Sequence, residues 1–166
     1  QIDELGYCLI SPDDKWFDDE SLTTNDSKTE HGKIKFSTGS FTPEELEAMI
    51  NSFPLDITFV DKDDTVKYFS HGSTRIFDRS KAILGRKVQF CHPPSSVHIV
   101  EKILSDFKSG KQNDAKFWIN FKGMFVHIAY YAVRNSAGEY LGTVEVTQDI
   151  AGFKATEGER RLLTYE

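Results

Sequence analysis

The chain has 166 residues, of which 39% are hydrophobic and 13% aromatic, a composition that suits one globular domain with extensions. No apolar run approaches the roughly 20 residues that span a bilayer, and the first residues lack the basic and apolar regions of a signal peptide. The net charge is −6, and no basic cluster supports phosphate binding. We therefore expect a cytoplasmic protein that binds neither membrane nor nucleic acid.

Residues 1–40 form an acidic extension with nine acidic and four basic residues. Their Ser, Thr, Asn and Asp content is typical of loops, although Trp16 and Phe17 could anchor the segment. Gly32 to Phe36 alternates enough to predict a short edge strand. The chain begins at Gln1, and we expect it to belong to a longer protein.

A flanking helix is predicted over residues 41–53. Thr42 can cap it, Pro43 suits the first helical position, and Glu45 completes a capping box. Its apolar residues share one stripe at helical spacing: Leu46, Met49, Ile50 and Phe53. We expect this stripe to cover one face of a sheet.

Residues 56–70 predict a β-hairpin around an acidic turn, Asp61 to Asp64. Short helical pieces are expected from His71 to His92, because Gly72 and Gly85 interrupt the segment. The clearest helix runs from a Ser95 cap to Gly110, and on it His98 lies opposite the apolar stripe.

Three runs rich in aromatic and β-branched residues follow, between Phe117 and Ile150, and predict an antiparallel meander. In the middle run both sets of alternate residues are largely apolar, which predicts a sheet covered on both faces, by helices or by a second chain. One set is Phe125, His127, Ala129, Tyr131 and Val133, and the other is Val126, Ile128, Tyr130 and Ala132. A charged helix is expected over residues 152–166, although Gly152 and Gly158 weaken it.

This order of elements resembles a PAS domain. The segments DITFVDKDDTVKYFS, RIFDRSKAILGRKVQFCHPPSSVHIVEKILSDFKSG and LGTVEVTQDIAGFK resemble the PAS entry hairpin, helical connector and last strand. Closer still, CHPPSSVHIVEKIL, GMFVHIAYYAVRN and GERRLL resemble the C-terminal PAS module of bacterial proteins of unknown function that often carry a hemerythrin-like domain. No hemerythrin-like His/Glu pattern occurs in this sequence.

The resemblance implies an α+β fold: a five-stranded antiparallel sheet of order 2-1-5-4-3 with connector helices on one face. An N-terminal capping helix and a C-terminal exit helix would flank it. The predicted domains are the extension 1–40, the flanking helix 41–53, the PAS domain 54–151 and a signalling-type helix 152–166.

The family commonly holds a small-molecule cavity between sheet and connector. Apolar side chains on those elements are candidates to line it: Phe77, Val88, Phe90, Val100, Phe107, Ile128 and Tyr130. The ligand itself stays unknown. The function predicted from the resemblance is a sensory or interaction module without catalysis, which works as a homodimer and transmits through the exit helix.

An alternative is a heme- or metal-binding redox sensor, since neutral imidazole suits iron or zinc. Its candidate ligands are His71, His92 and His127, which do not form a recognised ligand pattern. A further alternative is a structural dimerisation module without ligand.

Other chemistry is disfavoured. In flavin PAS domains a reactive cysteine lies in a Gly-x-Asn-Cys-Arg-Phe stretch, but here Lys87 and Val88 occupy the Asn-Cys positions. Cys91 beside His92 lacks an orienting third group for nucleophilic catalysis. The segment Asp61 to Asp64 lacks the Gly and distant Glu of a calcium loop.

Overall fold

The computed structural model describes residues 32–73 and 75–161. These residues divide into two compact units, one formed by residues 45–155 and the other containing residues 32–44 and 156–161. Most of the predicted acidic extension, with Trp16 and Phe17, lies outside the described residues.

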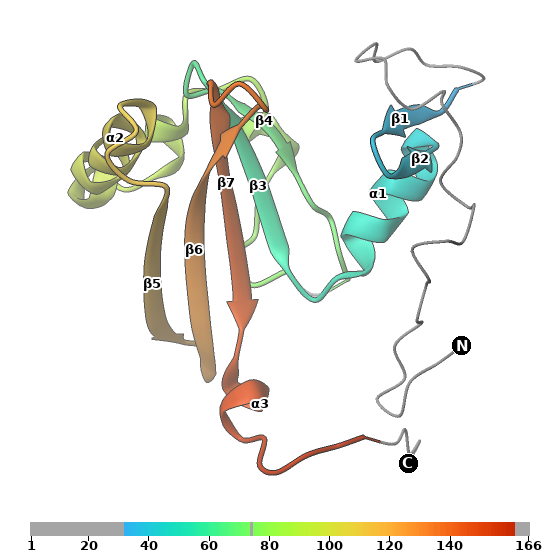
Figure 1. Ribbon diagram of the computed structural model, residues 1–166. Coiled ribbons are helices and arrows are strands. Elements are labelled where there is room, and N and C mark those ends of the chain that lie inside the picture. The colour runs from blue at the N-terminus through green and yellow to red at the C-terminus, as the bar shows by residue number, and fades with distance from the viewer. Residues whose placement is uncertain (1–31, 74, 162–166) are drawn as a thin grey trace. The chain divides into compact units, whose positions relative to one another are not determined.

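Five antiparallel strands make up the main sheet: β3 (Asp56–Asp61), β4 (Val66–Phe69), β5 (Asp114–Phe121), β6 (Met124–Arg134) and β7 (Tyr140–Asp149). Their order is β4-β3-β7-β6-β5 (Figure 1). Numbered from β3 onwards, this is the order 2-1-5-4-3 that the sequence predicted. The α+β, PAS-like fold class is therefore confirmed.

Side-chain carboxylates and special backbone angles make the tight turns of this sheet. Asp61 Oδ1 accepts hydrogen bonds from the backbone N–H groups of Asp63 and Thr65, both at 2.9 Å, and thus holds the acidic turn between β3 and β4. Between β5 and β6, Lys122 and Gly123 both have positive φ, 48° and 81°, as a two-residue hairpin turn requires.

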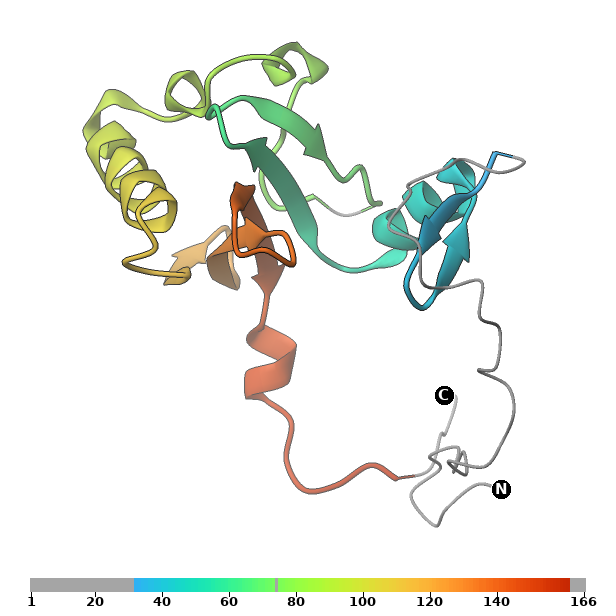
Figure 2. The ribbon, with the colours of Figure 1, turned by 45° about the horizontal axis from the view of Figure 1, so that its top comes forward.

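The connector between β4 and β5 consists of two 3-10 helices, η3 (Lys81–Ile83) and η4 (Val88–Cys91), and the helix α2 (Pro94–Lys108). The expected short helical pieces are therefore present. The predicted Ser95 cap is wrong, because α2 starts one residue earlier and its N-cap is Pro93. Residues of η4 and α2 pack with β3 and β4 in one core: Val60, Val66, Val88 and Leu104. Figure 2 shows the ribbon of the connector, coloured from green to yellow, between β4 and β5.

The two faces of the main sheet follow from its register. One face, called here the covered face, carries Thr58, Val60, Tyr130, Thr143 and Glu145, and the other, called the open face, carries Ile57, Phe59, Ala129, Val144 and Val146. On the open face Trp118 and Tyr131 are 64% and 38% exposed. Within the described residues, helices thus cover the open face only in part, and its cover by a second chain stays a prediction.

The flanking helix forms as α1 (Pro43–Ser52), but none of its residues is buried. Met49 and Phe53 of the apolar stripe are 36% and 45% exposed, so the stripe does not bury itself against the sheet as we expected. The predicted short edge strand forms, but not as part of the main sheet. Residues Ile34–Phe36 (β1) pair with Gly39–Phe41 (β2) in a separate two-stranded sheet.

At the exit from the sheet, one carboxylate joins three segments. Asp149 Oδ1 accepts hydrogen bonds from the backbone N–H groups of Phe125, at 3.1 Å, and Ala151, at 3.0 Å. The exit helix α3 (Ala151–Lys154) follows directly. Residues 155–161 are not helical, which corrects the predicted helix 152–166, of which residues 162–166 lie outside the described residues. All of residues 151–161 are exposed, and short helices need packing to persist.

Within the described residues, no helix is both long and apolar enough to cross a membrane.

Candidate functional site

A small cavity of about 30 Å³ lies between the covered face and the helices η4 and α2. Its apolar wall consists of five aliphatic side chains: Val60, Val88, Val100, Ile103 and Leu104. Its polar wall consists of Thr58, Arg79, His92, Tyr130, Thr143 and Glu145. Three of the five apolar residues belong to α2, whereas four of the six polar residues belong to the strands β3, β6 and β7 and the other two, Arg79 and His92, to the connector outside its helices.

An ion pair dominates the polar wall. Arg79 Nη2 donates to Glu145 Oε1 at 2.8 Å, and the two side chains are only 13% and 12% exposed. Glu145 lies centrally on the covered face, since Thr58 and Tyr130 are its cross-strand partners. The pair therefore ties the connector to the middle of β7 inside the cavity.

Two further titratable groups face this pair. Burial lowers the pKa of His92, and the charge of Glu145 opposes that effect. Burial, with the neighbouring carboxylate of Glu145, raises the pKa of Tyr130 well above its ordinary value. Near neutral pH the imidazole and the phenol are therefore uncharged, and the only charges on the wall are those of the ion pair.

Two polar atoms of the wall have no hydrogen-bond partner among the residues that the structure describes. They are Thr58 Oγ1 and Arg79 Nε, both buried. In contrast, the hydroxyl of Thr143 is hydrogen-bonded to that of Tyr140 at 2.8 Å. An unpaired buried polar group costs about 1–3 kcal/mol, so a molecule that satisfied these two atoms would gain affinity from them.

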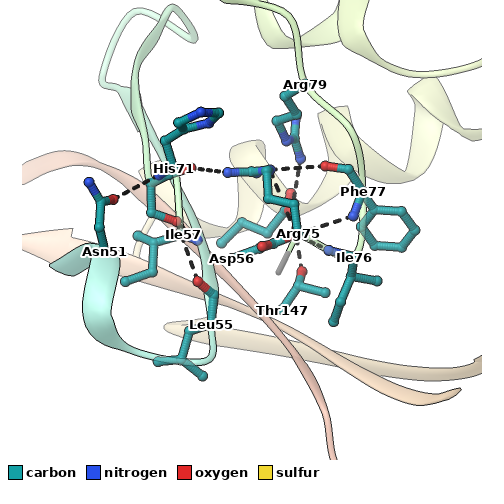
Figure 3. A network of polar contacts seen from close by, with 12 residues as sticks. Asn51, Leu55, Asp56, Ile57, His71, Arg75, Ile76, Phe77, Arg79 and Thr147 are labelled. Atoms are coloured by element: carbon teal, nitrogen blue, oxygen red, sulfur yellow. Dashed lines mark hydrogen bonds and ion pairs between the residues drawn. The ribbon is translucent and has the colours of Figure 1, made fainter. Parts of the chain in front are cut away.

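Beside the cavity, a polar network fixes the start of the connector to the sheet (Figure 3). Asp56 Oδ2 accepts hydrogen bonds from the N–H groups of Ile76 and Phe77, at 3.0 and 3.2 Å, and lies 3.8 Å from Arg75 Nε. Arg75 in turn donates to the carbonyl oxygens of Phe77 and Ser70. Burial lowers the pKa of Arg75, whereas Asp56 raises it.

Of the seven predicted cavity residues, Val88, Val100 and Tyr130 line the cavity. The other four lie elsewhere. Phe107 is buried at 1% exposure but does not line it, and Phe90 is 79% exposed. Phe77 packs against the ring of Phe121 with centroids 5.2 Å apart. Ile128 lies on the covered face opposite Phe117 and Thr147, outside the lining.

The three predicted histidines do not meet. His92 lines the cavity, whereas His127 lies on the open face between Trp118 and Gln148. His71 is exposed, and its backbone N–H donates to Asn51 Oδ1 at 2.8 Å. Among the described residues there is no cluster of three or more His, Cys, Asp or Glu side chains that could hold a metal ion.

The polar wall was missed by reasoning that looked for apolar side chains. A signal was present in β7, where Thr143, Glu145 and Thr147 alternate. Alternation of this kind normally indicates a solvent-exposed face, yet Thr143 and Thr147 are 4% and 0% exposed. Because the neighbouring middle strand is apolar on both sides and helices were expected above the sheet, this alternation could have been interpreted as a buried polar row.

Comparison with known proteins supports the same fold. The family model described as PAS domain matches residues 46–151. A C-terminal domain from Streptococcus mutans is 33% identical, with a TM-score of 0.70, and the match covers 74% of this chain and 95% of that one. No curated protein matches.

More distant solved structures resemble the chain less closely. The PAS domain of a protein from Colwellia psychrerythraea is 15% identical, with a TM-score of 0.48, over 66% of this chain and 97% of that chain. The PAS domain of Bordetella pertussis BvgS is 17% identical, with a TM-score of 0.49, over 65% and 85%. The family model and the Streptococcus mutans structure together decide the matter: this chain belongs to the PAS domain family.

Proposed function

We propose that this chain is a sensory module in which occupancy of the cavity changes the position of β7 and of the exit segment after it. PAS domains are generally sensory rather than catalytic. The observation that carries the proposal is the Arg79–Glu145 ion pair, because it connects the cavity wall directly to the strand that leads out of the domain.

The route from the cavity to the exit is short. Glu145 lies four residues before Asp149, whose carboxylate holds the first residue of α3 and the start of β6. The amide of Ile150 also donates to the carbonyl oxygen of Phe125 at 2.9 Å. A ligand that repositioned Glu145 would therefore act on a rigid strand whose far end fixes α3. Such a ligand can shift the population of exit conformations only if its contacts with the protein differ between those conformations.

The proposal can be tested without knowing the ligand. Val100→Phe places a ring in the cavity, at a packing cost of about 1–3 kcal/mol. We expect altered hydrogen exchange at the amides of Ile150 and Lys154, which are hydrogen-bonded at the exit. The matched control is His98→Phe, on the exposed side of the same helix. Equal exchange in both variants would contradict the coupling.

We also propose that the module works as a homodimer through the open face. The supporting observation is that its apolar residues, such as Ile57, Val144 and Val146, are only half-buried. Val146→Glu should lower the association constant in analytical ultracentrifugation, whereas Ala82→Glu, at an exposed position of η3, should not. A wild-type protein that stays monomeric at high concentration would refute this part.

The second candidate is a heme or metal sensor, and the observation that favours it is His92 on the cavity wall. The cavity volume of about 30 Å³ opposes heme, since cofactor sites usually measure several hundred Å³. An absorption spectrum after heme addition, together with metal analysis, separates the candidates. A Soret band lost in His92→Ala would favour heme.

A further inference from the structure

The polar wall restricts the kind of ligand that the cavity can hold, an inference that rests on the proposed function. Arg79 and Glu145 carry opposite charges at 2.8 Å and neutralise each other. No other member of the wall is charged near neutral pH. A charged ligand would therefore be buried without a free counter-ion, which is strongly unfavourable.

The unpaired atoms define what a neutral ligand must offer. Arg79 Nε can only donate a hydrogen bond, and Thr58 Oγ1 can donate or accept one. Thr58 is 2% exposed and lines the cavity, and its hydroxyl has no partner in the described part of the chain. A carbonyl oxygen, which has two lone pairs and no hydrogen to donate, can accept hydrogen bonds from groups of this kind. Elsewhere on the lining, Val88, Val100 and Leu104 offer only apolar contact.

The size of the cavity sets a further limit. Its volume of about 30 Å³ is two to three times the roughly 10–15 Å³ that one water molecule needs. The site as it stands suits a molecule of a few non-hydrogen atoms.

We propose that the cavity binds a small, uncharged carbonyl compound, whose oxygen accepts hydrogen bonds from Arg79 Nε and Thr58 Oγ1 and whose apolar part packs against Val88, Val100 and Leu104. Acetamide and acetate test the charge requirement, because they have nearly the same size and shape and differ in charge. Xenon tests the apolar wall alone, since it enters apolar cavities without hydrogen bonds.

The experiment is an NMR titration of the full chain, read from the methyl groups of Val88, Val100 and Leu104. Acetamide should give saturable shifts there, and acetate should bind at least tenfold more weakly. Thr58→Val should weaken acetamide binding about five- to tenfold, as expected for one hydrogen bond, whereas Thr58→Ser should restore it. His127→Gln, on the open face, should leave it unchanged.

Each outcome decides a different question. Equal or tighter binding of acetate, or unchanged acetamide affinity in a folded Thr58→Val variant, would overturn the carbonyl assignment. If Thr58→Val does not fold, acetate decides the question. Acetate binding then overturns the assignment. No acetate binding, together with equal acetamide affinity of Thr58→Ser and wild type, supports it. If xenon binds and acetamide does not, this inference is refuted, but the proposal that the cavity binds a ligand stands. Failure of all three probes would count against the proposed function itself.

Discussion

The covered and open faces of the main sheet differ in a way that reverses the usual expectation. On the covered face, the residues Asp56, Thr58, Thr143 and Thr147 are polar and at most 4% exposed. On the open face, Ile57, Phe59, Val144 and Val146 are apolar and only half-buried. Most buried polar residues are satisfied by hydrogen bonds, although the hydroxyl of Thr58 has no partner among the described residues. Exposed apolar patches are typical of surfaces that bind a partner. The buried polar row of β3 and β7 thus makes contacts within the domain beside Val60 of the core, whereas the apolar row of the open face is left partly exposed.

The strongest way to break this contrast is to remove Asp56 from the covered face. Asp56→Ala would leave two backbone N–H groups without their acceptor and Arg75, whose side chain is 9% exposed, without its counter-ion. We expect a loss of about 3–5 kcal/mol in the free energy of unfolding, measured by urea denaturation. Asp114→Ala removes an exposed ion pair with Lys116 and should cost less than about 1 kcal/mol. Similar losses in the two variants would show that the covered face does not depend on this network.

The second test uses Gly142, whose backbone lies close to the backbone of Val60 and to the ring of Phe59 on the open face. A Cβ atom at Gly142 would collide with the carbonyl oxygen of Val60 and come within 2.8 Å of the ring of Phe59. Gly142→Ala should therefore cost about 1–3 kcal/mol by overpacking, seen as a lower midpoint of thermal unfolding. Gly152→Ala, which meets nothing within 4 Å, is the control and should be neutral or slightly stabilising. A tolerated Gly142→Ala would mean that β3 and β7 can separate at this point.

The same substitution on opposite faces sharpens the contrast directly. Val60→Ala removes two buried carbon atoms from the core, where Val60 is 5% exposed, and should cost about 1.5 kcal/mol. Val146→Ala, at a half-buried position, should cost about half as much at low protein concentration. If the open face forms a dimer, the cost of Val146→Ala will increase with protein concentration, while that of Val60→Ala will not. Parallel denaturation at two concentrations measures this.

The smallest expected effect is a pH dependence from His92 on the covered side. Burial lowers the pKa of His92 from its ordinary value of 6.5, so the unfolded chain binds this proton more readily than the folded chain does. Stability from the neutral imidazole is therefore full above pH 6.5 and decreases as the pH falls toward the folded-state pKa. His92→Gln should reduce the slope of unfolding free energy between about pH 7 and 5. A variant with the wild-type slope would contradict this assignment.

Sequence reasoning predicted the sheet well because its signals are local and repeated. Alternating aromatic and β-branched residues, the Lys122–Gly123 turn and the Asp61 turn each specify part of the sheet without reference to distant residues. The separate pairing of residues 34–36 and the early end of the exit helix were not predictable in this way. Both depend on which partner a short, marginal segment finds, and a propensity pattern does not encode that choice.

The site was predicted in part for a related reason. Val88, Val100 and Tyr130 are apolar or aromatic candidates for the cavity that the PAS resemblance implied, and the structure places them on its lining. Arg79 and Glu145 are 66 residues apart, and either one alone is typical of a solvent-exposed charge. Only their meeting across the connector and β7 identifies them as part of the wall. Phe90 shows the converse, since an aromatic residue in an apolar run can still point to solvent.

The carboxylate of Asp149 fixes the position at which a helix attached to the end of the domain would start. Because it fixes where α3 begins, a helical reporter spliced directly after Lys154 would start with a defined rotational phase. Each extra residue at the junction would turn that reporter by about 100° and advance it by about 1.5 Å. Output measured across a series of insertions should therefore vary with a period of about 3.6 residues. The number of inserted residues would then set the rotation of the reporter in a chimeric sensor.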